Sequence, residues 1–302
     1  MFERLRGIYA AAITPLDANF AIDLDGFPRL LDFLAERGCH GALLFGTTGE
    51  GPSFAPAERL AALRCAQAWR KNWPDFRLLA GVGTPSLQET IELSQAAFEI
   101  GMDGVVVLPP YYFRKVSDEG LFQWFGQVIG RAVLSGQALF GYHFPSISGV
   151  PLSIELLARL QAAFPDRFAG LKDSSGEAGF ASSLGARFGD SLIVLTGNDR
   201  LLSLALENQA AGAITAMANL YSYDLRQTWE AHERGDTMTQ AQRQSQLEAA
   251  RTILDKYPPF PPLLKALLAR RHNFPRWSVR PPLLPLSLQD EDLVLKELNG
   301  LN

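Results

Sequence analysis

Two kinds of hydrophobic pattern alternate along the chain. Short stretches of five to seven residues are almost entirely apolar, whereas the longer stretches between them repeat apolar residues every three or four positions. A strand that is buried on both faces shows no polar alternation, so the short stretches predict parallel β-strands. We expect these strands at Gly7–Ile13, Gly41–Phe45, Arg77–Val82, Gly104–Leu108, Ala138–Tyr142, Phe168–Lys172, Leu192–Thr196 and Ala211–Thr215.

The stretches between the strands predict amphipathic helices. Ala57–Trp73 has apolar residues at helical spacing, and Pro56 stands where a helix begins. In Ser86–Ile100, Glu89 follows three residues after Ser86, which is the capping-box pattern of a helix start.

Eight strand–helix units in series predict an α/β fold, specifically a (β/α)8 TIM barrel. The main alternative is a doubly wound sheet, which would place a glycine-rich phosphate loop after its first strand. Here the first strand is followed by Thr14-Pro15-Leu16-Asp17, which is not such a loop. The barrel is therefore the predicted architecture.

The pattern changes after the eighth strand, where only helical segments remain. Proline pairs separate these segments, because proline cannot continue a helix. We predict a barrel unit at 1–224 and, at 225–302, a barrel-closing helix with a C-terminal helical appendage. The expected helices are Leu225–Arg234, Thr239–Lys256, Leu263–Arg271 and Leu288–Leu298.

Composition excludes several classes of partner and cofactor. The 302 residues are 47% apolar and 20% charged, with a net charge of −4, so the chain lacks the basic surface that nucleic acid or an anionic membrane requires. Two cysteines and four histidines show no metal-ligand spacing, so we expect no metal and no cofactor. No apolar run is long enough to cross a bilayer. We expect a soluble, cytoplasmic protein.

Lys172 stands at the end of the sixth predicted strand, in Phe168-Ala169-Gly170-Leu171-Lys172-Asp173. A charged amine at the end of a buried strand is costly to desolvate. A neutral lysine amine is a nucleophile toward ketones, so this position indicates Schiff-base chemistry. The alternative is a lysine that only marks where the strand meets water.

Other reactive groups follow neighbouring strands. In a TIM barrel the carboxyl ends of the strands share one mouth, so these groups would converge there. The turn Gly46-Thr47-Thr48-Gly49 offers N–H groups and hydroxyls to a carboxylate, and Tyr142 could relay protons through a threonine hydroxyl. Each also has a structural interpretation, as an ordinary turn or as a core tyrosine.

Four motifs follow one another over nearly the whole chain. They are Gly46-Thr47-Thr48-Gly49-Glu50, Pro110-Tyr111-Tyr112, Tyr142-His143-Phe144-Pro145 and Gly170-Leu171-Lys172-Asp173. In order and spacing they resemble the motifs of the dihydrodipicolinate synthase and N-acetylneuraminate lyase superfamily of class I aldolases. The resemblance implies that Lys172 forms a Schiff base with pyruvate and that Tyr142 is the acid–base residue.

The same resemblance implies the remaining site residues and the assembly. Thr47 and Tyr112 would extend the proton relay, with Tyr112 reaching the site of a neighbouring subunit in a homotetramer built as a dimer of dimers. Thr48 and Ile214 would hold the pyruvate moiety. The rest of the substrate would meet the loop after the seventh strand, at Gly197, Asn198 and Asp199.

The chain departs from the family pattern at two positions beside Tyr142. Dihydrodipicolinate synthases usually have an arginine for the carboxylate of aspartate semialdehyde where this chain has Ile147, although Arg114 or Arg200 could replace it. His143 stands where asparagine is usual. The chain also lacks the Asp-Glu pair with which sialic acid lyases hold sugar hydroxyls, because Asn198-Asp199-Arg200 keeps only the aspartate.

The chain looks most like the 2-keto-3-deoxygluconate aldolase branch. We therefore expect a pyruvate-dependent aldolase or lyase whose substrates are pyruvate and an aldehyde, acting on a 2-keto-3-deoxy sugar acid. One alternative is 4-hydroxy-tetrahydrodipicolinate synthase, which condenses pyruvate with aspartate semialdehyde. Another, from a different class, is a catalytically silent sensor or scaffold that binds a keto acid. A metal-dependent barrel aldolase is a further alternative.

Overall fold

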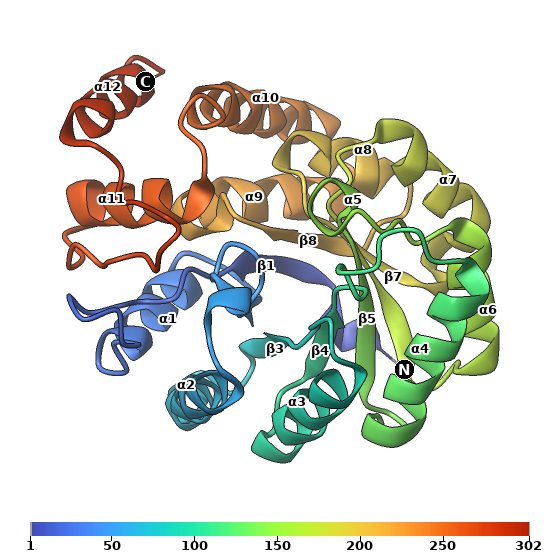
Figure 1. Cartoon of the computed structure of the whole chain (residues 1–302). Coiled ribbons are helices and arrows are strands. Elements are labelled where there is room, and N and C mark those ends of the chain that lie inside the picture. The colour runs from blue at the N-terminus through green and yellow to red at the C-terminus, as the bar shows by residue number, and fades with distance from the viewer. Residues whose placement is uncertain (1, 302) are drawn as a thin grey trace.

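Eight parallel strands close into one barrel in the computed structural model, which describes residues 2–301 (Figure 1). Each strand pairs with the next in sequence, and the last pairs with the first. The predicted TIM barrel is thereby confirmed. The strands are β1 Gly7–Ala11, β2 Gly41–Leu44, β3 Arg77–Gly81, β4 Gly104–Val107, β5 Ala138–His143, β6 Phe168–Asp173, β7 Ile193–Thr196 and β8 Gly212–Thr215.

Helices surround the strands on the outside, as Figure 1 shows. The predicted capping residue Ser86 accepts a hydrogen bond from the N–H of Glu89, and a helix begins directly after it. The helices between strands are α1 Gly26–Glu36, α2 Pro56–Trp69, α3 Leu87–Ile100, α4 Asp118–Ala132, α5 Pro145–Ser148, α6 Ile154–Ala163, α7 Ala178–Phe188 and α8 Leu202–Glu207.

The C-terminal part of the chain is helical, with α9 Ala218–Glu233, α10 Thr237–Leu254, α11 Phe260–His272 and α12 Leu288–Asn299. Helix α9 begins before the expected Leu225, because hydrogen bonds from the Asn219 side chain connect its first turn to the end of β1. The Asn219 side chain accepts from the N–H of Ile13 and donates to the carbonyl of Ala11. The division predicted at residue 225 therefore falls inside α9, and a two-unit organisation stays a prediction.

The barrel interior is filled by side chains from alternate strand positions, including Tyr9, Leu43, Leu79 and Phe140. A second apolar cluster fills the space between the strands and the outer helices. Because the interior is packed, a small molecule can enter only at an end of the barrel. A site for a small molecule is therefore expected at the strand ends.

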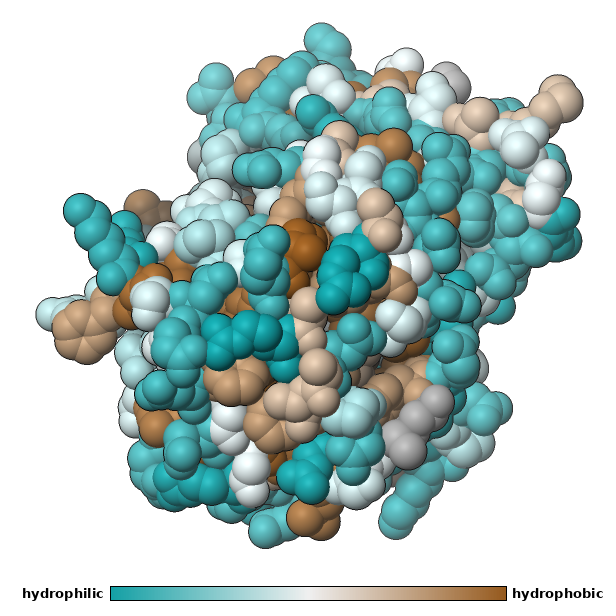
Figure 2. Space-filling view, turned by 90° about the vertical axis from the view of Figure 1, so that its right-hand side faces the viewer, coloured by the Kyte–Doolittle hydropathy of each residue, from teal (hydrophilic) through white to brown (hydrophobic). Residues whose placement is uncertain are grey.

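Helix surfaces complete the fold on the outside. The side of the molecule that lies to the right in Figure 1, over α4, α6 and α7, is mostly hydrophilic, with apolar residues in small groups (Figure 2). No helix within residues 2–301 is both long enough and apolar enough to cross a membrane.

Candidate active site

A pocket of about 400 Å³ opens at the carboxyl ends of the strands. Pockets of this size hold small metabolites. Its walls come from the barrel strands, from the loops after β5, β6 and β7, and from the C-terminal helices. The side chains that line it include Thr47, Thr48, Tyr142, Ile147, Lys172, Ser174, Ser175, Asn198, Ile214, Arg251 and Phe260.

Lys172 and Tyr142 lie side by side in this pocket because they are register partners on β6 and β5. A shift in register between Leu139 and Phe140 leaves Gly170 and Lys172 opposite Phe140 and Tyr142. The Lys172 Nζ is 3.7 Å from the centroid of the Tyr142 ring, and the lysine is only 3% exposed. No ion pair to Lys172 occurs within residues 2–301. The Lys172 amine therefore lies in the pocket without a paired carboxylate.

The Tyr142 hydroxyl lies 3.2 Å from Thr47 Oγ1, within hydrogen-bond distance. Thr47 belongs to the turn after β2, which reaches over to β5 at the mouth. Thr48, the next residue, is buried and also lines the pocket. The structure thus brings four predicted residues together: the lysine, the tyrosine and both threonines. A hydroxyl pair beside an amine is the arrangement that proton transfer during imine formation needs.

A buried ion pair between Glu50 and Lys265 holds this turn in place. The Lys265 Nζ donates to Glu50 Oε1 at 2.5 Å and to the carbonyl of Ser278, and the N–H of Arg280 donates to Glu50 Oε2. Both charged side chains are buried. Burial lowers the pKa of Lys265, and the Glu50 carboxylate opposes that shift. The ion pair links the two-threonine turn to α11, a partner that sequence patterns did not indicate.

Asp199 does not line the pocket, although its neighbours Gly197 and Asn198 do. Its carboxylate is fully buried and accepts a hydrogen bond from Arg251 Nη1 at 2.7 Å. Burial raises the pKa of Asp199, and Arg251 opposes that rise. In this structure the Asp199 carboxylate therefore contacts Arg251, which comes from α10 and does line the pocket. A contact between Asp199 and sugar hydroxyls stays a prediction.

Tyr112 lies outside this group. The residue is 77% exposed on the segment between β4 and α4, next to the similarly exposed Phe113, and it does not line the pocket. Arg114 and Arg200 do not line it either, whereas Ile147 does. Neither arginine therefore occupies the position that an arginine at 147 would take in this chain.

His143 faces away from the pocket, as expected for a strand residue next to the inward Tyr142. Its Nδ1 accepts a hydrogen bond from the N–H of Leu152, and its ring stacks on Phe180 at 4.4 Å. Burial lowers the pKa of His143 to about 4. The neutral His143 thus acts as a hydrogen-bond acceptor for a backbone N–H group, a role that the side-chain oxygen of asparagine can also fill.

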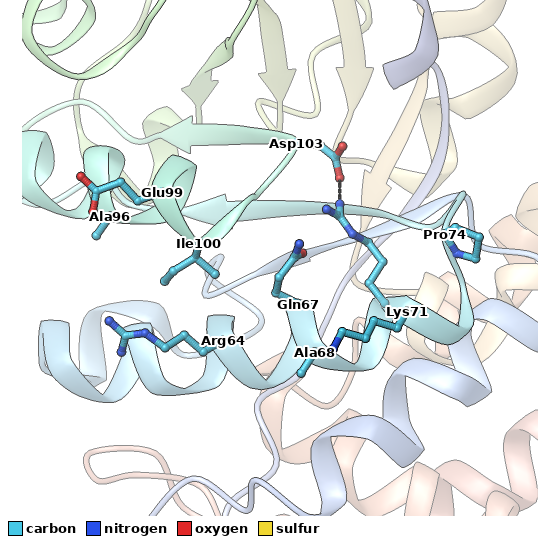
Figure 3. Close-up of a pocket in the computed structure, with 10 residues that line it drawn as sticks. Arg64, Gln67, Ala68, Lys71, Pro74, Ala96, Glu99, Ile100 and Asp103 are labelled. Carbon is cyan, nitrogen blue, oxygen red and sulfur yellow. Dashed lines mark hydrogen bonds and ion pairs between the residues drawn. The ribbon is translucent and has the colours of Figure 1, made fainter.

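A larger hollow, about 740 Å³, lies outside the barrel between α2 and α3 (Figure 3). It is at the opposite end from Lys172, since Asp103 in its wall directly precedes β4. The Arg70 guanidinium there is bonded to Asp103 and to the carbonyl of Gly101. No group of three or more His, Cys, Asp or Glu side chains within 2–301 is placed to hold a metal ion.

Comparisons with known proteins agree with this geometry. The model of the dihydrodipicolinate synthetase family matches residues 4–300. A curated protein of Chloroflexus aurantiacus named an uncharacterized DapA-like lyase is 37% identical over 94% of this chain and 93% of its own. The 4-hydroxy-tetrahydrodipicolinate synthase 2 of Streptomyces coelicolor is 35% identical over 76% of this chain and 73% of its own. Among solved structures, YagE of E. coli K12, determined in complex with pyruvate, has a TM-score of 0.91 and 28% identity, with 98% of each chain covered.

Proposed function

The chain belongs to the dihydrodipicolinate synthetase family, whose members are lyases, and we propose that it acts on pyruvate compounds through an imine on Lys172. The observation that carries the proposal is the contact of the Lys172 amine with the Tyr142 ring, with the Tyr142 hydroxyl bonded to Thr47. The structure of the relative YagE with pyruvate supports the choice of keto acid.

The chemistry begins with attack of the neutral Lys172 amine on the substrate ketone. Tyr142 gives a proton to the carbinolamine oxygen, which leaves as water, and the imine forms. The carboxylate of the keto acid lies against the turn at Thr47 and Thr48, which supplies N–H groups and hydroxyls. Ile214 packs against the apolar part of the pyruvyl group.

The imine then serves as an electron sink. The bond between C3 and C4 breaks when the C4 hydroxyl loses its proton to Tyr142, which releases an aldehyde and leaves an enamine on the lysine. Protonation of the enamine carbon and addition of water return pyruvate and the free amine. Atoms and charge balance without an added oxidant or reductant.

For the substrate, we propose a 2-keto-3-deoxy sugar acid. Ser174, Ser175 and Asn198 line the pocket beyond Lys172 and suit a hydroxylated aldehyde. The second candidate is 4-hydroxy-tetrahydrodipicolinate synthase, because the Streptomyces coelicolor relative has that name. Ile147 weighs against it, since a hydrocarbon cannot form the charge-assisted bond of roughly 1.5–3 kcal/mol that an arginine makes to a carboxylate.

We further propose the tetramer implied by the family resemblance, with Tyr112 donated to a neighbouring site. The exposure of Tyr112 and Phe113 supports it, because a single chain leaves two adjacent aromatic rings in water. Sedimentation should show an assembly larger than one chain. The two free thiols, Cys39 and Cys65, fit a reducing compartment such as the cytoplasm.

A substrate panel tests the proposed reaction. Pyruvate release from 2-keto-3-deoxygluconate is measured with lactate dehydrogenase and NADH, and synthase activity is measured with pyruvate, aspartate semialdehyde and a coupled reductase. The proposal predicts cleavage of the sugar acid and little condensation with the semialdehyde. Condensation without cleavage would replace it by the second candidate.

A further inference from the structure

Within residues 2–301, two cationic side chains and no carboxylate line the pocket. Lys172 comes from β6, and Arg251 comes from α10 in the C-terminal part of the chain. Of these two cations, the proposed reaction uses only Lys172. A second cation in a site for sugar acids needs an explanation, because hydroxyl groups alone do not require a full charge.

Hydrogen bonds from two of its three nitrogens fix the guanidinium group of Arg251. Nη1 donates to Asp199 Oδ2 and Nε donates to Asp255 Oδ1, each at 2.7 Å. The guanidinium carbon stands 4.7 Å from the centroid of the Phe260 ring, which also lines the pocket. A guanidinium fixed in this way loses little freedom when it binds a further group.

The third nitrogen of Arg251 is left for a ligand. Within residues 2–301, Nη2 makes no hydrogen bond, and it is not among the buried polar atoms without a partner, so it is open to solvent. The side chain as a whole is 19% exposed, and it lines the pocket. Two N–H groups therefore remain available at the pocket wall.

The acids that fix Arg251 do not cancel its attraction for an anion in the pocket. Asp199 is fully buried behind it, and Asp255 is shared with Arg200 at 3.0 Å. Two acids and two arginines make this cluster neutral, and only Arg251 reaches the pocket wall. An anion there meets the cation first, with the carboxylates farther away.

We propose that Arg251 binds a carboxylate at the end of the substrate remote from the ketone, so that the substrate class is a 2-keto acid with a second carboxylate. Cleavage would then give pyruvate and an aldehyde that itself carries a carboxylate. This inference rests on the proposed function and deepens it.

Two substrates that differ at the far end test the inference. 2-Keto-3-deoxyglucarate ends in a carboxylate, and 2-keto-3-deoxygluconate ends in a hydroxymethyl group. The wild-type kcat/KM should favour the diacid by at least about tenfold, and Arg251→Gln should lower the diacid value about 10- to 100-fold, the range of a charge-assisted hydrogen bond. The monoacid value should change less than about threefold, and the diacid loss should lie mainly in KM.

Two further variants separate recognition from support of the fold. Arg251→Lys keeps the positive charge but lacks the paired N–H donors of the guanidinium group, so it should retain part of the diacid preference. Arg243→Gln, on the same helix but paired with Asp224 outside the pocket, should leave both substrates unchanged. Equal losses for both substrates in Arg251→Gln would overturn the inference, as would a wild type that prefers the monoacid.

Pyruvate trapping with borohydride separates the two proposals. A wild type that traps pyruvate and cleaves only the monoacid would refute the role of Arg251 and leave the proposed function standing. Trapping without cleavage of either sugar acid would refute the inference and the sugar-acid substrate together. A wild type that traps no pyruvate would refute the imine chemistry itself.

Discussion

Replacing Lys265 by methionine tests how firmly the two-threonine turn depends on its buried ion pair. The substitution keeps the length of the side chain and removes its charge. Glu50 would then remain as a buried carboxylate with only the N–H of Arg280 as a partner, and the carbonyl of Ser278 would lose its donor. Removal of one partner from a buried ion pair costs about 3–5 kcal/mol, and we expect that loss in the free energy of unfolding.

The double variant shows whether the cost comes from an uncompensated charge. Glu50→Gln combined with Lys265→Met removes both charges, so it should be more stable than Lys265→Met alone and give a coupling of at least about 2 kcal/mol. Urea unfolding at one fixed protein concentration compares the wild type, Lys265→Met, Glu50→Gln and the double variant. Lys256→Met is the control, because the Lys256–Glu297 pair is on the surface and should contribute less than about 1 kcal/mol.

A Lys265→Met variant within about 1 kcal/mol of wild type would contradict this role of the ion pair, and so would single losses that simply add. The same variant has a consequence in the active site. If the pair positions the turn, Lys265→Met should raise the KM for the keto acid even at temperatures where it is fully folded.

Three other changes test the remaining parts of the site. Tyr142→Phe removes the hydroxyl that lies on Thr47 and should lower kcat by about 10²–10⁴-fold, measured by pyruvate release; a smaller effect would place the acid–base role elsewhere. Because burial lowers the pKa of His143 to about 4, the unfolded chain binds its proton first as the pH falls below 6.5, and the folded protein should lose about 2 kcal/mol at pH 5. His143→Asn should abolish this loss in urea unfolding at pH 7.5 and pH 5, and an unchanged acid sensitivity would contradict it. Gly170→Ala would place a Cβ 1.9 Å from the Ile193 carbonyl oxygen and should lower the unfolding free energy by more than about 1 kcal/mol, whereas the control Gly130→Ala, with open space around it, should be neutral or stabilising.

The barrel could be predicted from sequence because its strands are buried on both faces. That burial removes polar alternation, so strands such as β2 and β6 stand out from the amphipathic helices around them. Lys172 and Tyr142 could be placed together for the same reason, since a closed barrel brings consecutive strand ends to one mouth.

The partners from the C-terminal helices could not be predicted in this way. Glu50 and Lys265 are 215 positions apart, and Arg251 reaches the pocket only through the docking of α10 against the loop at Asp199. No local periodicity reports how one helix packs on a distant loop. Asp199 illustrates the difficulty, because a polar residue after a strand predicts a ligand contact equally well whether it faces the pocket or a buried arginine.

The most direct test of the central claim is to reduce the protein with borohydride in the presence of pyruvate and to map the modified peptide by mass spectrometry. We expect one reduced pyruvyl group per chain, on Lys172, and none in Lys172→Arg. No adduct, or an adduct on a different lysine, would contradict the assignment of Lys172 as the nucleophile.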